Sequence, residues 1–200
     1  MGKLIVEQIV SVDGYAADDT GGIGFFTSAR DFSGDEPEQL RMLARVGGIV
    51  MGRVTYAMFA EYWPTIEPRQ QAVAGPINAL PKFVVSSTLE AAPWGQDQQV
   101  EILRGDVVAA VRALRPRIGG DLIVWGSLTL ADALLRAGEV DVLRLRLVPV
   151  LVGSGRSFTP GDLGERALSL VKAESFRGGP AVLEYGLTRQ VSKRAAEPVV

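Results

Sequence analysis

The chain alternates between short, nearly all-apolar runs and longer stretches in which apolar residues recur at helical spacing. The apolar runs predict β-strands over residues 4–12, 47–51, 82–87, 100–105 and 122–125. The helical spacing predicts helices over residues 35–46, 54–62, 107–114 and about 128–136. Because continuous apolar strands are buried on both faces, this alternation predicts a mainly parallel sheet with helices on each side.

Two of the predicted helices carry positional signals. Asp106 is a good N-cap for the helix over 107–114, and Pro116 ends that helix. In the helix over 35–46, the spacing exposes Glu38 to solvent. The positions that it turns toward the core are Leu40, Leu43 and Ala44.

The C-terminal third predicts a different kind of strand pairing. Residues 142–153 are strand-like, with Arg144 and Arg146 alternating against apolar neighbours. The runs over 167–176 and 181–188 are separated by Gly178, Gly179 and Pro180, which predicts a closing hairpin. We therefore predict a three-layer α/β/α fold whose mostly parallel, mixed sheet ends in an antiparallel hairpin. A single domain is expected over 1–189, with a flexible tail over 190–200.

Composition narrows the chemistry. The 200 residues are 47% hydrophobic and 22% charged, with a net charge of -2, which argues against a nucleic-acid binder that works through bulk charge. The chain has no Cys and no His, so zinc sites of the Cys/His type, thiol nucleophiles and Ser-His-Asp triads are excluded. The N-terminus lacks a long uncharged apolar run, and we expect a cytoplasmic protein with no membrane partner.

Small and hydroxyl-bearing residues follow several of the predicted strands. The junctions are Gly52-Arg53-Val54-Thr55, Ser86-Ser87-Thr88, Gly126-Ser127 and Gly153-Ser154-Gly155. Since the carboxyl ends of parallel strands share one edge of a sheet, we expect these segments to gather there. Free amides at a helix start, hydroxyl donors and a planar cation suit phosphate groups. Each junction alone also fits an ordinary turn, and Ser127 fits a helix cap.

Two better-known phosphate motifs are absent. The sequence contains no GxxxxGK[ST], which argues against a P-loop ATPase. GSGRSF (153–158) has the first two glycines of GxGxxG but lacks the third and the helix that should follow. The junctions therefore point to a nucleotide with several phosphates that is bound in another way.

Five segments then carry a family pattern, namely SVDGYAA (11–17), MGRVTY (51–56), KFVVSSTL (82–89), IVWGSLTLADALL (123–135) and VDVLRLRLVPVLVGSGRSF (140–158). In this order they resemble the reductase domain of bacterial riboflavin biosynthesis, in its free-standing form within the dihydrofolate reductase-like superfamily. The resemblance covers roughly residues 3–188. It implies a dihydrofolate reductase-like fold, NADPH as cofactor and a homodimer.

The resemblance also assigns roles along the cofactor. Arg53 would contact the 2'-phosphate of the adenosine ribose, and Thr55 the pyrophosphate region. The segment from Ser86 to Thr88 would flank the adenosine. Gly126 and Ser127 would form the turn that passes the pyrophosphate to a helix, where the family often has two glycines. The full set of expected cofactor-binding residues is Gly52, Arg53, Val54, Thr55, Ser86, Ser87, Thr88, Trp125, Gly126, Ser127 and Leu128.

The sequence gives fewer indications of which residues bind a substrate. Asp31 lies five positions after Phe26, a spacing similar to the acid that supports protonation in dihydrofolate reductases, although an acid here also fits a helix terminus. Asp13 belongs to a Ser-x-Asp-Gly turn that would shape the mouth of the nicotinamide site or simply close the first strand. Phe26, Phe59 and Trp63 would form an aromatic wall, although Phe59 and Trp63 also suit one core-facing side of a helix.

These observations predict an NADPH-dependent reductase of a small, pteridine- or pyrimidine-like substrate, with Asp31 as catalytic acid. One alternative is a true pyrimidine reductase of riboflavin synthesis, against which stands the lack of a deaminase domain with zinc ligands. A second is a module that binds NADPH without turnover. A third is a dimeric scaffold in which the strand over 142–153 pairs with its counterpart in a second copy.

Overall fold

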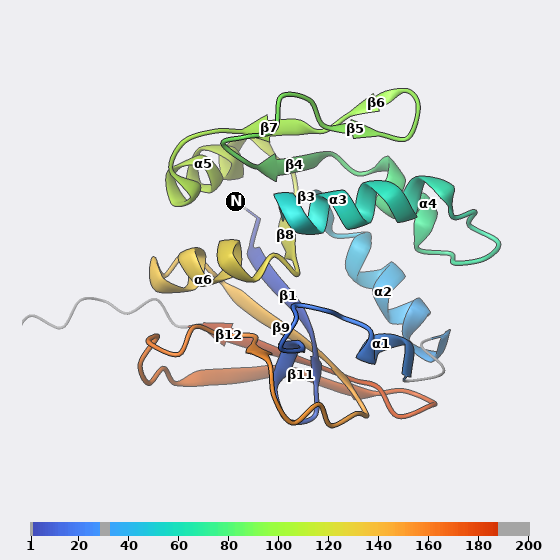
Figure 1. Ribbon diagram of the computed structural model, residues 1–200, viewed down its shortest axis with the longest axis vertical. Helices are drawn as coiled ribbons and strands as arrows, with labels where there is room; N and C mark the ends of the chain where they lie inside the picture. Colours follow the sequence, from blue (N-terminus) through green and yellow to red (C-terminus); the bar gives the residue numbers. More distant parts are fainter. Residues whose placement is uncertain (1, 29–32, 188–200) are drawn as a thin grey trace, which may run out of the picture.

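The computed structural model describes residues 2–28 and 33–187, and its centre is a mixed β-sheet between two layers of helices (Figure 1). Six parallel strands of this sheet are β1 (Leu4–Ser11), β3 (Val46–Gly52), β4 (Lys82–Val85), β7 (Glu101–Leu103), β8 (Asp121–Trp125) and β9 (Val142–Val148). The strand order is β11-β12-β9-β1-β8-β3-β4-β7. The predicted mostly parallel sheet is confirmed.

The predicted hairpin closes one edge of the sheet. It consists of β11 (Leu168–Ser175) and β12 (Ala181–Leu187), which pair antiparallel, and β12 also pairs antiparallel with β9. Both edges of β9 are thus occupied, by β1 and by β12. The idea that this arginine-bearing strand pairs with a second copy is therefore wrong, because its backbone hydrogen bonds are already used within the sheet.

The helices are short and lie in two groups. They are α1 (Phe25–Ser28), α2 (Glu36–Leu43), α3 (Arg53–Tyr62), α4 (Ala74–Ala79), α5 (Val107–Leu114) and α6 (Leu128–Arg136). Small ladders link the loops, namely β2 (Tyr15–Ala17) with β10 (Arg156–Ser157) and β5 (Pro93–Trp94) with β6 (Gln98–Gln99). Within the described ranges, no helix has the length and apolar character needed to cross a membrane.

Two hydrophobic cores lie on opposite faces of the sheet. On one face α5 and α6 bury Leu114 and Leu134 completely, and on the other α2, α3 and α4 bury Met42, Tyr56 and Ile77. Figure 1 shows α5 and α6 on the left of the sheet and α2, α3 and α4 on its right. The predicted three layers are confirmed, and the second face is the one that carries the charged side chains described below.

The predicted N-cap of α5 is confirmed, whereas the predicted burial of two other positions is not. Asp106 caps α5, because its side chain accepts a hydrogen bond from the Ala109 amide at 2.8 Å. For the helix predicted over 35–46 two burial predictions were wrong, since Glu38 is buried and Ala44, just after the end of α2, is exposed. A prediction from helical periodicity places every carboxylate in solvent. The Glu38 carboxylate is buried because it contacts two cations from the C-terminal part of the chain, Arg144 and Lys172.

Candidate functional site

The carboxyl ends of three neighbouring strands bring the main junctions together. Strands β8, β3 and β4 are adjacent and parallel, and Gly52 lies in register with Val85. Gly126, Arg53 and Ser86 directly follow these strands. The loop at Gly153 lies over the ends of β1 and β9 on the same edge. The sheet thus places all four predicted junctions along one edge.

Ser127 ties two of these junctions into one unit. The Gly52 amide donates to Ser127 Oγ at 2.9 Å, and the Ser127 amide donates to Thr55 Oγ1 at 3.0 Å. Ser127 Oγ in turn donates to the Trp125 carbonyl at 2.9 Å. These bonds join the start of α3 to the start of α6, which are 72 residues apart where Ser127 meets Thr55.

The Gly126-Ser127 turn has an unusual backbone. Both residues are left-handed, with φ of 53° and 52°, and Ser127 alone among the described non-glycine residues has a positive φ. For an L-residue this conformation costs roughly 1–2 kcal/mol, and such outliers gather at ligand sites. In this conformation the Ser127 hydroxyl contacts the Gly52 amide and does not cap α6, the helix that Ser127 precedes.

Helices α3 and α6 both begin without a side-chain cap. Gly52 at the start of α3 has no side chain, and the Ser127 hydroxyl does not bond to the first-turn amides of α6, in contrast to Asp106 at α5. An open helix N-terminus carries roughly half a positive elementary charge and presents unpaired amides. Two such helix N-termini side by side are suited to binding an anion.

Two more segments place hydrogen-bond donors beside the N-termini of α3 and α6. Arg53 is exposed and has no carboxylate partner within the described residues, and Val54 beside it is exposed as well. Ser86 Oγ accepts hydrogen bonds from the amides of Thr88 at 3.2 Å and Leu89 at 3.1 Å. This turn leaves the side chains of Ser87 and Thr88 in solvent. The predicted cofactor-binding residues are therefore neighbours along the edge.

The aromatic residues divide into two groups. Phe59 lies edge-on to both Trp63, at a ring-centroid distance of 6.0 Å, and Trp125, at 5.8 Å. Both Phe59 and Trp63 pack on the core beneath α3. Phe26 lies apart, since its ring meets that of Phe25 within α1 and no described ring of the other group. Of the three rings predicted to form a wall, Phe59 and Trp63 thus lie in one cluster with Trp125, and the place of Phe26 beside a substrate stays a prediction.

A buried acid under this aromatic cluster was missed by the sequence analysis. Glu7 on β1 is 1% exposed, and it lies in register with Trp125 on one side and Arg144 on the other. The Trp125 Nε1 atom donates to one carboxylate oxygen at 2.6 Å, and the Arg144 Nε atom donates to the other at 2.5 Å. Polar residues inside apolar strands were the signal that could have revealed it.

Arg144 is the centre of a buried ionic network. Besides Glu7 it pairs with Glu38 on α2 and Glu184 on β12, and Lys172 on β11 also pairs with Glu38. Burial would lower the pKa of the Arg144 guanidinium, but the carboxylates Glu7 and Glu38 raise it above its usual value. Burial raises the pKa of Glu38, yet hydrogen bonds from Arg144 and Lys172 outweigh this and lower it.

A second buried pair lies beside the network, at the start of α2. Asp35 accepts from Arg146 Nε at 2.5 Å and from Arg146 Nη2 at 2.7 Å. Burial raises the pKa of Asp35, and Arg146 opposes this shift. Asp31, the predicted catalytic acid, lies outside the described residues. Among the described residues, the fully buried acids on this face of the sheet are thus Glu7, Asp35 and Glu38, and Glu184 lies partly buried beside them.

Asp13 acts as a link between two loops. Its carboxylate accepts hydrogen bonds from the amides of Val152 at 3.2 Å and Gly153 at 2.8 Å. Hydrogen bonds from Ser11 and from these amides hold the pKa of Asp13 below its ordinary value. The Ser-x-Asp-Gly turn therefore joins the end of β1 to the loop after β9.

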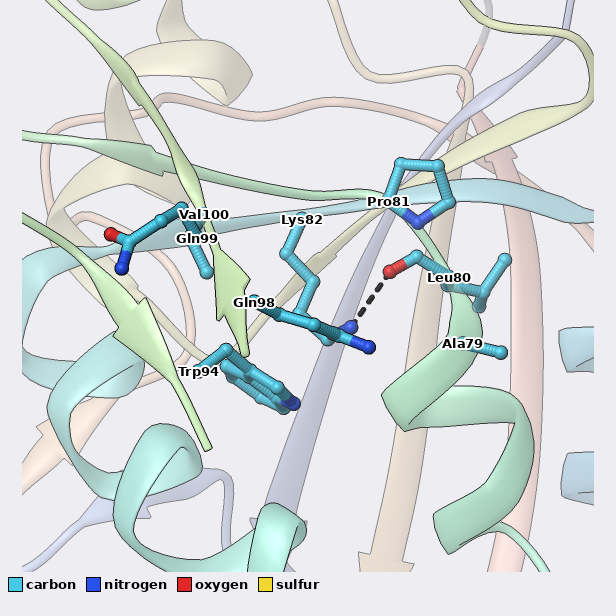
Figure 2. A pocket seen from close by; sticks show the side chains of 8 residues that line it. All are labelled: Ala79, Leu80, Pro81, Lys82, Trp94, Gln98, Gln99 and Val100. Atoms are coloured by element: carbon cyan, nitrogen blue, oxygen red, sulfur yellow. Dashed lines mark hydrogen bonds between the residues drawn. The ribbon is translucent and has the colours of Figure 1, made fainter. Parts of the chain in front are cut away.

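A cavity of about 270 Å³ lies at the opposite, amino-terminal end of β4 (Figure 2). Lys82 projects into it and donates to the carbonyls of Asn78 and Leu80, each at 2.7 Å, at the end of α4. The Lys82 ammonium also lies 4.6 Å from the centroid of the Trp94 ring. Burial lowers the pKa of Lys82 to about 8. The Lys82 ammonium thus covers two carbonyls at the C-terminus of α4, and the cavity lies at the opposite end of β4 from Ser86.

Comparison with known proteins identifies the relatives of this chain. The family model of the RibD C-terminal domain matches residues 2–183. YyaP, an uncharacterized protein of Bacillus subtilis, is 22% identical over 92% of this chain and 94% of its own.

Solved structures show the same fold. A protein from Shewanella sp. PV-4 described as a putative riboflavin biosynthesis protein superposes with a TM-score of 0.74 at 22% identity, over 94% of this chain and 99% of the other. Dihydrofolate reductase from Enterococcus faecalis, complexed with NADP(H), superposes with a TM-score of 0.54 at 13% identity, over 93% and 96% of the two chains. The dihydrofolate reductase-like fold expected from the resemblance is confirmed.

Proposed function

The chain belongs to the RibD C-terminal domain family, and on that premise we propose that it is an NADPH-dependent reductase of a small pteridine- or pyrimidine-like heterocycle. The observation that carries the proposal is the pair of uncapped helix N-termini, α3 and α6, which Ser127 links beside Arg53, a residue with no carboxylate partner in the described part of the chain. Aligned amides and a free guanidinium suit a ligand with both a pyrophosphate and a separate phosphate.

The residues present fit such a cofactor. Gly126 has a left-handed φ of 53°, which glycine adopts without strain, so it permits the turn that brings the starts of the two helices together. We assign the pyrophosphate to the first turns of α3 and α6, the 2'-phosphate to Arg53, and the adenosine to the segment Ser86–Thr88. NADPH, when bound, supplies a hydride from C4 of its nicotinamide ring to an acceptor carbon.

On the substrate side, we assign the aromatic cluster of Phe59, Trp63 and Trp125 to the wall that excludes water beside a flat ring. Glu7 is not the proton donor, because both of its oxygens are engaged and its side chain is buried. Asp31 remains the proposed proton donor on the family resemblance. The buried network at Arg144 holds the strands beneath the aromatic cluster in register.

Binding of the cofactor tests the proposal directly. Titration with NADPH and with NADH, followed by nicotinamide fluorescence, should show tighter binding of NADPH. Arg53→Ala should weaken NADPH roughly tenfold to a hundredfold, as expected for loss of one charge-assisted contact, without weakening NADH. Equal binding of the two nucleotides by the native protein, or binding of neither, would overturn the proposal.

Turnover separates the enzyme from a module that binds NADPH without chemistry. A screen of pteridines and aminopyrimidines for NADPH oxidation should find at least one substrate, and Asp31→Asn should lower turnover while NADPH affinity stays intact. Unchanged turnover would remove Asp31 from the reaction. Activity confined to the aminopyrimidines of riboflavin synthesis would favour the pyrimidine reductase, and NADPH binding without any turnover would favour the non-catalytic module.

We also propose that the protein is a homodimer, the state implied by the family resemblance, and that β11 is the contact strand. Its outer edge pairs with no other strand among the described residues, and Leu168, Leu170 and Val171 are exposed apolar side chains along it. Light scattering during gel filtration should give twice the chain mass, and Val171→Lys should shift it to one chain. A native monomer, or a dimer that survives Val171→Lys, would contradict this.

A further inference from the structure

The cavity at the amino-terminal end of β4 contains a buried cation without an acidic partner. Lys82 is 7% exposed, and it forms no ion pair with a carboxylate among the described residues. The other two buried cations in the described ranges are both paired, Arg115 with Asp141 and Arg144 with Glu7. Because buried charges in proteins are ordinarily paired, the ammonium of Lys82 is a site at which a counter-ion is expected.

The contacts of Lys82 leave one of its hydrogen-bond donors available. An ammonium group has three N–H donors, and two of them are used by the carbonyls of Asn78 and Leu80, each at 2.7 Å. The third has no hydrogen-bond acceptor in the described part of the chain. The Trp94 ring, with its centroid 4.6 Å from the ammonium, offers only its π face. An acceptor that enters the cavity can therefore bind the ammonium without displacing a carbonyl.

The walls of this cavity are held in place by side-chain hydrogen bonds. The Trp94 Nε1 atom donates to Asn78 Oδ1 at 2.9 Å, and Asn78 Nδ2 donates to the carbonyl of Trp63, just after α3, at 2.9 Å. The Tyr56 hydroxyl donates to the Pro93 carbonyl at 2.7 Å. These bonds fasten the hairpin of β5 and β6 to α3 and α4, so the cavity is formed before any ligand binds.

The lining of the cavity is apolar on one side and carries amide donors on the other (Figure 2). Leu80, Pro81 and Val100 supply apolar surface, and Gln98, opposite Trp94 in the ladder of β5 and β6, supplies a side-chain amide. None of the described residues that line it is acidic. Its volume of about 270 Å³ is just below the range of roughly 300–1,000 Å³ that is typical of ligand pockets, which indicates a small ligand.

We propose that this cavity binds a small organic acid with a compact apolar body. The carboxylate accepts hydrogen bonds from the third N–H of Lys82 and from the side-chain amide of Gln98, and the body of the acid lies against Leu80, Pro81 and Val100. An inorganic anion would leave these apolar walls uncovered, and a neutral molecule would leave the buried charge without a counter-ion. The proposal does not depend on the proposed reductase function, because the cavity lies at the opposite end of β4 from Ser86.

The affinity for such an acid should fall at alkaline pH. Burial lowers the pKa of Lys82 to about 8, so the cation is lost above this pH while a carboxylate ligand stays ionised. Helix α4 and strand β3 carry no titratable residue. Asp97, between β5 and β6, and Glu101 on β7 are exposed acids, and Glu101 pairs with Arg117. Tyr56 on α3 has its pKa raised by burial, away from this range.

Three probes separate the charge of the ligand from its apolar body. Benzoate has both, benzamide has the body without the charge, and acetate has the charge without the body. Binding is followed through the ¹³C methyl NMR signals of Leu80 and Val100, which report on the cavity itself and are observable at alkaline pH. Lys82→Met removes the cation, and Lys3→Met is the matched control, because Lys3 is exposed and lies outside the cavity.

Benzoate should shift both methyl signals saturably and bind about tenfold more tightly than benzamide or acetate, as expected for a charge-assisted contact with an apolar body. Its affinity for the native protein should fall more than about tenfold between pH 7 and about 9.5, because the ligand requires the protonated form of Lys82. Lys82→Met should abolish binding, and Lys3→Met should leave it unchanged.

Three results would overturn the proposal and leave Lys82 only a cap for the carbonyls of α4. They are no saturable shift at Leu80 and Val100, equal binding of benzoate and benzamide, and a benzoate affinity that stays constant across pH 8. If Lys82→Met does not fold, the pH dependence of benzoate binding to the native protein decides the question.

Discussion

Replacement of Arg144 by methionine should strongly destabilise the protein, because it leaves buried carboxylates without their cation. Arg144 is 1% exposed and pairs with Glu7, Glu38 and Glu184. Glu38 keeps Lys172, and Glu184 is partly accessible, so Glu7 is the carboxylate that suffers most. Removing one partner of a buried ion pair costs roughly 3–5 kcal/mol, and we expect a loss in this range near pH 7.

The loss should depend on pH with a defined sign. In the native protein burial raises the pKa of Glu38, but Arg144 and Lys172 outweigh this and lower it, so its contribution to stability is present at neutral pH and is lost as the pH falls through the lowered pKa. Arg144→Met removes one of these two cations, so the difference in stability between the native protein and the variant should shrink as the pH falls.

Urea unfolding at neutral and at acidic pH measures this, with the slope m as a check that the same surface is exposed. The double variant Glu7→Gln/Arg144→Met should recover much of the stability, because it removes the orphaned charge as well as the cation. Glu7→Gln alone is the control, since it leaves Arg144 with Glu38 and Glu184. A loss below about 1 kcal/mol in Arg144→Met, or no recovery in the double variant, would refute the account of a cation that compensates buried acids.

Three further outcomes follow from single contacts. Because burial lowers the pKa of Lys82 to about 8, the native protein should gain stability as pH rises above 8, by up to about 1.4 kcal/mol per unit, and Lys82→Met should lack this gain in urea unfolding. Ser127→Ala and Ser127→Gly both lose the hydrogen bond to the Gly52 amide. The glycine variant should be more stable than the alanine variant by about 1 kcal/mol in thermal unfolding, because glycine tolerates the left-handed backbone at this position. Equal stability of the two variants would show that the backbone of Ser127 is not strained. Asp106→Ala should cost about 1 kcal/mol of stability by the same measurement and leave NADPH affinity unchanged, and an altered affinity would show that α5 is coupled to the cofactor edge.

Much of the fold and part of the site follow from short stretches of sequence. The apolar runs, the turn at Gly178-Gly179-Pro180 and the cap at Asp106 are decided by neighbours a few residues away, so periodicity and turn chemistry suffice to predict them. The convergence of Gly52, Ser86 and Gly126 also follows, because parallel strands must end at a common edge.

The tertiary structure alone decided how these elements contact one another. Glu38 is buried because α2 crosses Arg144, 106 residues away, and periodicity within a helix carries no trace of that distant cation. Phe26 and Phe59 share the aromatic character expected of a wall, yet they belong to separate clusters. Ser127 fits a helix cap by sequence, but it bonds to Gly52 of another strand. Local sequence determines which backbone conformations are favourable, whereas the partner of a buried polar group is fixed only when distant strands pair in register.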